Sequence, residues 1–220
     1  MIRQLLQALC VAGLVLSLAA TATPSSAVMP SQAQEWKFKV YLDDSEIGYH
    51  NFHLVEEHGR TRVITEAEFR VKFLFVTAYR YEHVNRETWQ GDCLAEISSR
   101  TDANGKHYSV VGYRVGEDFA LNAPGGHSEV PGCVKTFAYW DPGILDEPAL
   151  LNSQTGEILA VDVEPVAVET LNVKGREVET RRYRVHAKNM ELDIWYSRDQ
   201  RWVALESTVK GGRKLRYELT

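Results

Sequence analysis

The chain's seven histidines are its best candidates for acid–base chemistry or metal binding, and their spacing tests the second role. They are His50, His53, His58, His83, His107, His127 and His186. An odd separation places His50 and His53 on opposite faces of a strand. His50 and His58 share a face but would lie about 26 Å apart along a straight strand. Neither spacing forms a local zinc site, so we expect no metal and no cofactor. A site assembled from distant strands stays open.

A serine nucleophile needs a sharp turn that exposes its hydroxyl, and the nearest candidate is Ser128 within Gly126–Val130. This stretch lacks the second glycine of a nucleophile elbow, and Pro131 follows where a helix should begin. The sequence therefore identifies no catalytic residue. A Ser/His/Asp triad built from distant residues stays open, because triads are recognised by geometry.

Carboxylates that could act as a paired acid and base occur at three places in the chain. They are Asp43 with Asp44, Glu56 with Glu57, and Glu66 with Glu68. The first two pairs fall in predicted turns, and the third lies on the polar face of a predicted strand beside Arg70. A solvated surface explains all three better than a glycosidase site does.

Aromatic side chains are the strongest candidates for ligand contact. Tyr139 and Trp140 precede residues 141–150, a stretch that breaks the strand pattern with apolar residues and two prolines. Docked incompletely inside a curved sheet, such a segment would leave a pocket lined by its apolar side chains. The indole of Trp140 makes it the expected gate residue. The predicted ligand site comprises Tyr139, Trp140, Ile144, Leu145, Phe73 and Phe75.

The elements that must position these residues are mainly strands. Residues 177–220 alternate apolar and polar side chains at a period of two, which predicts antiparallel sheet with one buried face. Trp195 has the opposite parity to Ile194 and Tyr196, so it either covers a second apolar surface or is exposed. Breaks short enough for hairpin loops fall at 188–189, 198–201 and 210–212.

The first half of the chain follows the same period. The pattern over residues 63–75 would span about 40 Å, longer than an ordinary strand, and indicates a curved sheet. Asn104 and Gly105 predict a type I′ hairpin turn. Residues 123–132, rich in Pro and Gly, predict a loop that closes over one end of the sheet, and a helix is expected only around residues 142–150.

The predicted fold class is therefore all-β with minor α. It is a single, strongly curved antiparallel sheet or half-barrel of meander topology, with a short helix or loop packed in its concave side.

The N-terminus predicts export. A basic residue, an apolar stretch over residues 5–20 and small residues after it make residues 1–27 a signal peptide. Cys10 lies in this leader without an adequate lipobox, so we expect release and no stable membrane anchor. Residues 28–34 predict a disordered lead-in, and residues 35–220 predict one domain with one core. The expected location is periplasmic or secreted.

Charge and hydropathy limit the partners of the chain. Its formal net charge is −5, with charges interspersed rather than grouped, so nucleic acid is not expected to bind. After the leader, no segment approaches the ~18 apolar residues that span a bilayer. The expected partner is an apolar small molecule or a lipid, and the sequence does not specify an oligomeric state.

Two cysteines, Cys93 and Cys133, follow the predicted leader. An even pair in an oxidising compartment predicts a disulfide. Closing this loop would contribute about 4 kcal/mol in the chain-entropy treatment. Two buried free thiols are the alternative, and the absence of a Cys-x-x-Cys spacing argues against a redox-active pair.

Four segments carry a resemblance to a known family: YWDPGIL at 139–145, LLNSQTGE at 150–157, DIWYS at 193–197 and KGGRKLRYEL at 210–219. They resemble an uncharacterised family of secreted proteobacterial proteins, a domain of unknown function. Relatives often carry Asp where this chain has Ser197, so no role is carried over to that position. More distantly, the pattern is similar to the curved sheets of periplasmic lipoprotein carriers. That similarity implies a hydrophobic concavity partly closed by a helix or loop, and supplies no catalytic residue.

These observations favour a periplasmic binding or carrier protein that holds a lipid-like or other apolar ligand in the concavity of its sheet. Two alternatives stay open. The first is an enzyme, a hydrolase or isomerase acting on a lipid-like substrate, which a polar cluster in the concavity would favour. The second is a non-enzymatic envelope assembly factor that acts through an exposed sheet edge. Similarity of fold is a weak argument for any of the three.

Overall fold

The computed structural model describes residues 32–73, 76–209 and 211–220. The predicted leader and Cys10 lie outside these residues, so export stays a prediction. The elements in chain order are β1 (Gln32–Leu42), β2 (Ser45–Glu57), β3 (Arg60–Phe73), β4 (Val76–Gln90), β5 (Cys93–Ala103), β6 (Lys106–Val115), β7 (Asp118–Ala123), β8 (Gly126–Val130), the 3-10 helix η1 (Pro142–Asp146), β9 (Ala149–Leu151), β10 (Ile158–Ala160), β11 (Asp162–Val173), β12 (Arg176–Ala187), β13 (Met190–Ser197), β14 (Trp202–Val209) and β15 (Arg213–Leu219).

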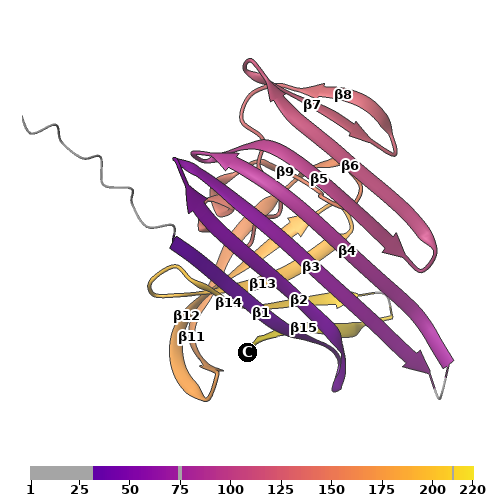
Figure 1. The fold of residues 1–220 in the computed structure, drawn as a ribbon. Coiled ribbons are helices and arrows are strands. Elements are labelled where there is room, and N and C mark those ends of the chain that lie inside the picture. Colours follow the sequence, from indigo (N-terminus) through magenta and orange to yellow (C-terminus); the bar gives the residue numbers. More distant parts are fainter. Residues whose placement is uncertain (1–31, 74–75, 210) are drawn as a thin grey trace, which may run out of the picture. The chain divides into compact units, whose positions relative to one another are not determined.

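Thirteen of these strands form one antiparallel sheet in the order β11-β12-β13-β14-β15-β1-β2-β3-β4-β5-β6-β7-β8 (Figure 1). The chain runs as a meander from β1 to β8, crosses to the opposite edge, and returns as a second meander from β11 to β15. The last strand then pairs with the first, placing Phe38 opposite Leu219 and Leu42 opposite Leu215. Within the described residues no ladder joins β8 to β11, so the sheet is open.

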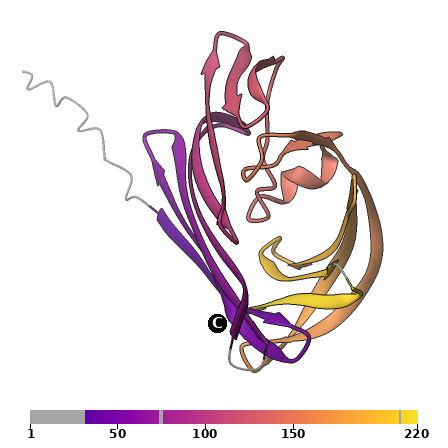
Figure 2. The same cartoon turned by 90° about the vertical axis from the view of Figure 1, so that its right-hand side faces the viewer.

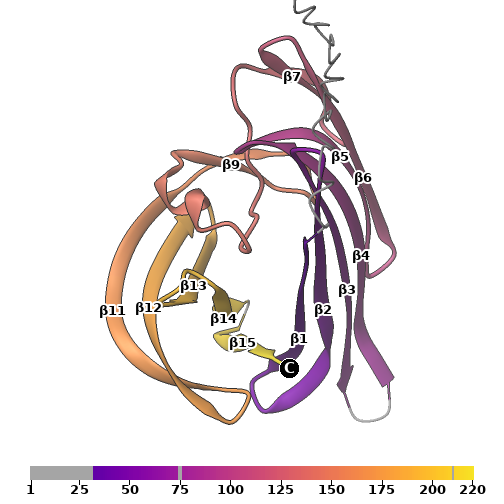
Figure 3. The same ribbon diagram turned by 60° about the vertical axis from the view of Figure 1, so that its left-hand side comes forward.

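The residues between the two meanders, 131–161, are called the crossing segment below; they contain η1 and the two-stranded sheet of β9 and β10. Figures 2 and 3 show the large sheet curling around this segment. The all-β class, the curvature and the element packed in the concave side agree with the sequence. No described helix is long and apolar enough to span a membrane.

Alternation of side chains builds the buried face as the sequence predicts. In β3, Val63, Thr65 and Ala67 point inward and are buried, while the residues between them are exposed or only partly covered. The strand has 14 residues, which confirms the expected unusual length. The predicted β5–β6 turn is also confirmed, because Asn104 and Gly105 both have positive φ values, of 57° and 85°, as a type I′ turn requires.

Three local predictions need correction. Strand β1 begins at Gln32, so residues 32–34 are not a disordered lead-in. They are strand because β2 extends far enough to pair with them, placing Gln32 opposite Glu56. Residues 123–132 are not simply a loop, because most of them belong to the hairpin of β7 and β8. The expected helix is the short η1, which ends before Pro148, a residue that disfavours helical backbone at the preceding position.

An aromatic cluster forms the core where the two meanders meet. The ring of Trp202 lies 4.3 Å from Phe38 and 5.1 Å from Phe52, measured between centroids, and the indole of Trp36 donates a hydrogen bond to the Trp202 carbonyl. Trp195 faces the other way, as its parity requires. It is buried there and donates to the carboxylate of Glu169, with a distance of 2.6 Å.

The predicted disulfide between Cys93 and Cys133 is present. It joins the first residue of β5 to the start of the crossing segment. Beside it, the Leu94 amide donates to the Val134 carbonyl at 2.9 Å. The entry of the crossing segment is therefore fixed to β5.

Candidate functional site

Strand β4 presents polar side chains to the inside of the curved sheet. Its inward residues between Tyr81 and Trp89 are His83, Asn85 and Glu87, which are 6%, 4% and 6% exposed. Polar groups at positions this dry cost free energy unless they are hydrogen-bonded. A strand face of this kind therefore needs either internal partners or a ligand.

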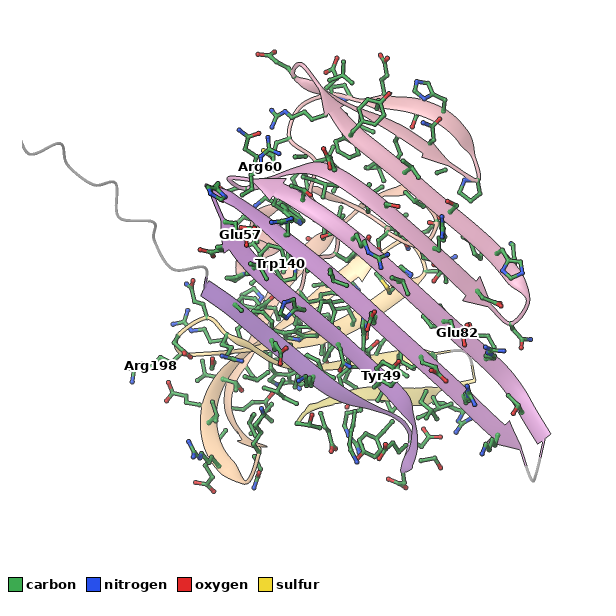
Figure 4. All side chains as sticks on the ribbon, viewed as in Figure 1. Tyr49, Glu57, Arg60, Glu82, Trp140 and Arg198 are labelled. Atoms are coloured by element: carbon green, nitrogen blue, oxygen red, sulfur yellow. A yellow bond between two sulfur atoms is a disulfide. The ribbon has the colours of Figure 1, made fainter. Side chains whose placement is uncertain are left out.

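The sheet register places His50 and His83 in the same cross-strand row. His50 in β2 lies opposite Ala67 in β3, which lies opposite His83 in β4. The small Ala67 side chain leaves space between the two imidazoles. The outward row one position away contains Tyr49 and Glu82, which are labelled in Figure 4. Alternation thus separates a charged outer face from an inner row in which His83 is buried and His50 is partly buried.

A cavity of about 190 Å³ lies between this inward face and the crossing segment. Strands β2 to β4 supply one wall, residues 136–140 and 152–154 of the crossing segment supply another, and Met190 and Tyr217 complete it. Trp140, labelled in Figure 4, is one of the lining residues. The complete lining is His50, Phe52, Thr65, Tyr81, His83, Asn85, Glu87, Thr136, Phe137, Ala138, Tyr139, Trp140, Asn152, Ser153, Gln154, Met190 and Tyr217.

Two buried polar atoms in this lining have no hydrogen-bond partner among the described residues. They are Nε2 of His50 and Oδ1 of Asn85. A third such atom, Nε of Arg182, is on the opposite face of the sheet, 3.6 Å from the carboxylate of Asp193. Native proteins rarely leave buried polar atoms unsatisfied. These two atoms mark the part of the cavity where a further hydrogen-bonding group would find partners.

Both cavity histidines are held in their neutral form. Burial lowers the pKa of His50 to about 3 and that of His83 to about 4, and the proximity of the two imidazoles adds to the effect on His50. His50 Nδ1 shares a hydrogen bond of 3.2 Å with the Tyr217 hydroxyl. His83 Nδ1 shares one of 2.8 Å with the Thr101 hydroxyl. Their protonation therefore costs more than that of an exposed histidine.

Glu87 is a buried carboxyl group surrounded by donors. Its Oε1 accepts from the Asn85 amide at 2.8 Å, and its Oε2 accepts from the Trp89 indole at 2.9 Å. Burial raises the pKa of Glu87, and hydrogen bonds from Asn85, Trp89 and Thr136 oppose that rise. An indole N–H can only donate, so this arrangement keeps the carboxyl group as an acceptor.

The loop of residues 152–157 closes the cavity and is attached directly to its polar wall. The Tyr81 hydroxyl donates to Gln154 Oε1 at 3.1 Å, and the Ser99 hydroxyl donates to the Ser153 carbonyl. Gly156 makes the close approach to β7 possible. Its φ is +74°, and a Cβ atom there would lie 2.2 Å from the Cβ of Ala123.

The predicted ligand residues separate into three groups. Tyr139 and Trp140 line the cavity. Ile144 is buried in the core and Leu145 packs against it, so neither belongs to the lining, because η1 turns its apolar side toward the core. Phe75 and the side chain of Phe73 lie outside what the structure describes, so their role stays a prediction.

Residues His50, His83, Asn85 and Glu87 are absent from the predicted site. The spacing of the histidines along one strand indicates no metal site, and Glu87 has no second carboxylate beside it in the sequence. A usable signal exists in the sequence, because His83, Asn85 and Glu87 share the parity of Tyr81 and Trp89. Polar residues at the apolar parity of a strand point to a site rather than to a surface.

A larger hollow, of about 490 Å³, lies beside the β11–β12 turn on the other face of β13 to β15. Its two acidic residues are paired, Glu218 with Arg216 at 3.0 Å and Glu206 with Lys214 at 2.9 Å. It offers no unsatisfied polar atom of the kind that His50 and Asn85 present. Within the described residues, no group of three metal-ligating side chains is close enough to bind a metal ion.

Comparison with known proteins identifies a family and a fold. A domain of unknown function, DUF6134, matches residues 38–220. Among solved structures, the chain is similar to a beta-barrel-like protein of domain of unknown function DUF1849 from Brucella abortus. The identity is 8%, the match covers 84% of this chain and 94% of that one, and the TM-score is 0.63, so the likeness concerns the fold alone. No curated protein matches the sequence.

Proposed function

Because the match over residues 38–220 makes this chain a member of the DUF6134 family, which carries no assigned activity, we propose a function from its cavity. The domain acts outside the cytoplasm as a binding or carrier protein for a small amphipathic molecule. The ligand's polar group lies against the inward face of β4, and its apolar part contacts the aromatic side chains of the crossing segment.

The observation that carries this proposal is the pair of unsatisfied atoms, His50 Nε2 and Asn85 Oδ1, in the lining of one cavity. Each unmade hydrogen bond at a buried site costs about 1–3 kcal/mol. A ligand that supplies both bonds recovers this free energy.

The size and chemistry of the cavity refine the expected ligand. A space of about 190 Å³ is smaller than usual drug-sized sites, which begin near ~300 Å³. It suits a small molecule or one end of a larger one better than a complete lipid. Phe137, Tyr139 and Trp140 supply apolar contact, while β4 supplies the polar end. The sequence-based expectation of a lipid-like or other apolar ligand is thereby refined to a small molecule with a polar group at one end.

The test combines native mass spectrometry of protein purified from its own envelope with a matched pair of tryptophan variants. Trp140→Ala removes a cavity wall, and we expect the bound mass to be lost. Trp195→Ala removes a similarly large ring from the opposite face, and we expect ligand retention. Either change can reduce stability by about 3–5 kcal/mol, so retention is measured at a temperature where both variants remain folded.

A parent protein that carries no small molecule in any preparation would contradict the proposal. Equal ligand loss in the two folded variants would contradict the assignment of the site to this cavity.

An enzyme is the second candidate, because a polar cluster does point into the concavity. His83 shares its hydrogen bond with Thr101, and Thr101 is not among the residues that line the cavity. His83 still lines the cavity, so the groups available for a reaction there are His50, His83 and Glu87. Incubating the protein with the recovered ligand distinguishes the two functions, since a carrier returns the molecule unchanged.

An assembly factor acting through a sheet edge receives less support. The edge strand β11 does expose apolar residues, with Val168 64% accessible. However, Pro165 and a register irregularity between Pro165 and Ala167 interrupt this strand, and both features discourage pairing with another strand. Copurification of a protein partner that depends on Val168 would favour this alternative.

A further inference from the structure

We propose, building on the proposed function, that the cavity selects an organic cation: a primary ammonium group attached to an apolar or aromatic body. The ammonium lies at Asn85 and Glu87, and its body contacts the aromatic rings of the lining. The proposed function describes the ligand's size and amphipathic character, and this inference specifies its charge.

The first argument is charge. Glu87 is the one acidic residue among the lining residues, all of which the structure describes, and that set contains no Lys or Arg. His50 and His83 are neutral because burial opposes their protonation. An anionic ligand would meet no cation and would face a carboxyl group in a poorly solvated space. Burial raises the pKa of Glu87, and a cation beside it would lower that pKa again and stabilise the carboxylate as its counterion.

The second argument is the direction of the hydrogen bonds. The Asn85 amide donates to Glu87, which leaves Asn85 Oδ1 as an acceptor without a donor. Glu87 accepts hydrogen bonds from Asn85, Trp89 and Thr136, and a carboxylate has about four acceptor sites, so one stays open. Asn85 and Glu87 are two positions apart on one strand, so both side chains lie on the same face. Together they require a donor, and an ammonium group supplies three.

The third argument is the aromatic lining. The cavity is bordered by six aromatic rings: Phe52, Tyr81, Phe137, Tyr139, Trp140 and Tyr217. Ring faces attract a cation when it lies near them, most strongly where water is excluded. The same rings provide apolar contact for the rest of the ligand. An ammonium group next to an aromatic or alkyl body therefore satisfies both parts of the site.

The test uses three probes of similar shape on the unmodified protein: 2-phenylethylamine, 2-phenylethanol and 3-phenylpropanoate. Isothermal titration at pH 7 measures each dissociation constant. A charge-assisted bond to a buried carboxylate predicts that the amine binds about 10- to 100-fold more tightly than the alcohol. We expect no measurable binding of the carboxylate probe. Equal or tighter binding of the alcohol or the carboxylate, or failure of the amine to bind, overturns the inference.

Two glutamate variants locate the effect. Glu87→Gln keeps the shape of the side chain but removes its charge, and we expect it to abolish the preference for amine over alcohol. Glu82→Gln changes the outward face of the same strand (Figure 4) and should leave the preference intact. An unchanged preference in folded Glu87→Gln protein overturns the assignment. If that variant does not fold, the probe series on the parent still decides the charge of the ligand.

The failure of this inference can be distinguished from failure of the proposed function. A neutral or anionic molecule recovered from the purified protein leaves the binding function standing and rejects the cation. A protein that carries no ligand and binds none of the three probes rejects both.

Discussion

The inward faces of β4 and β13 follow the same alternation and are buried to a similar degree, but their chemistry is opposite. Strand β13 buries Leu192, Ile194 and Tyr196, which pack into the hydrophobic core. Strand β4 buries His83, Asn85 and Glu87, and two groups on its side of the cavity have unsatisfied atoms. Burial of the apolar β13 side chains stabilises the folded state, whereas burial of the polar β4 side chains costs free energy. The β13 face therefore supports the fold, and the β4 face has the character of a site maintained at a cost in stability.

The largest expected effect is a loss of stability when an apolar residue of the core is replaced. Trp202 is fully buried between Phe38, Phe52 and Tyr139. We expect Trp202→Ala to lower the free energy of unfolding by about 3–5 kcal/mol, because it removes a large ring and leaves a cavity. Urea denaturation measures the change. As a control, Tyr113→Ala, at a ring that is 50% exposed, should change stability by about 0.5 kcal/mol or less.

The next largest effect is the pH dependence of stability that comes from the polar residues of β4. Burial lowers the pKa of His83 to about 4 in the folded protein, from the ordinary histidine value of about 6.5, so between these values the unfolded chain binds a proton that the folded chain does not. Stability contributed by neutral His83 is therefore complete above about pH 6.5 and is lost as the pH falls toward 4, by about 3 kcal/mol. Denaturation of parent and His83→Gln proteins at a series of pH values measures it.

Subtracting the variant from the parent is necessary because Glu87 acts in the opposite direction. Its pKa is raised, so it favours the folded state as the pH falls. The contribution of His83 is the extent to which the parent loses stability more steeply than His83→Gln as the pH falls. Identical pH dependence in the two proteins would show that His83 is not held neutral by the fold.

The smallest effect concerns the loop that closes the polar side. Gly156 has φ +74° and lies against Ala123, so Gly156→Ala adds a Cβ in a left-handed conformation at a crowded position. We expect a loss of about 1–3 kcal/mol in stability together with faster ligand release. Gly175→Ala has a similar φ, +75°, but no neighbour within 4 Å, so it should show less destabilisation and no change in release rate.

The sequence predicted the sheet well because its information is local and periodic. Alternation identified the buried faces, Asn104 with Gly105 identified their turn, and the cysteine count identified the disulfide. Pairing of β1 with β15 is not visible in such patterns, because it depends on residues at opposite ends of the chain. Strand β1 was also placed too late, since Ala33 and Gln34 are exposed and give no apolar signal.

The candidate site was predicted only in part, for the same physical reason. Tyr139 and Trp140 stand out because they interrupt the strand pattern, and both line the cavity. His50 and His83 are 33 positions apart in the sequence and share a row only through the registers of β2, β3 and β4. A cluster of polar residues from several strands can be recognised only when the registers between those strands are known.

The pairing of β1 with β15 determines when the large sheet can be completed during folding. A chain synthesised from its N-terminus forms β1 first, yet one edge of that strand has no partner until the final strand, of seven residues, arrives. Such sequence-distant pairing slows folding, and an unpaired edge is a template for association with other chains. Until β15 docks, that edge of β1 is therefore open to association with other chains, and it stays open until the most C-terminal strand of the sheet has been made.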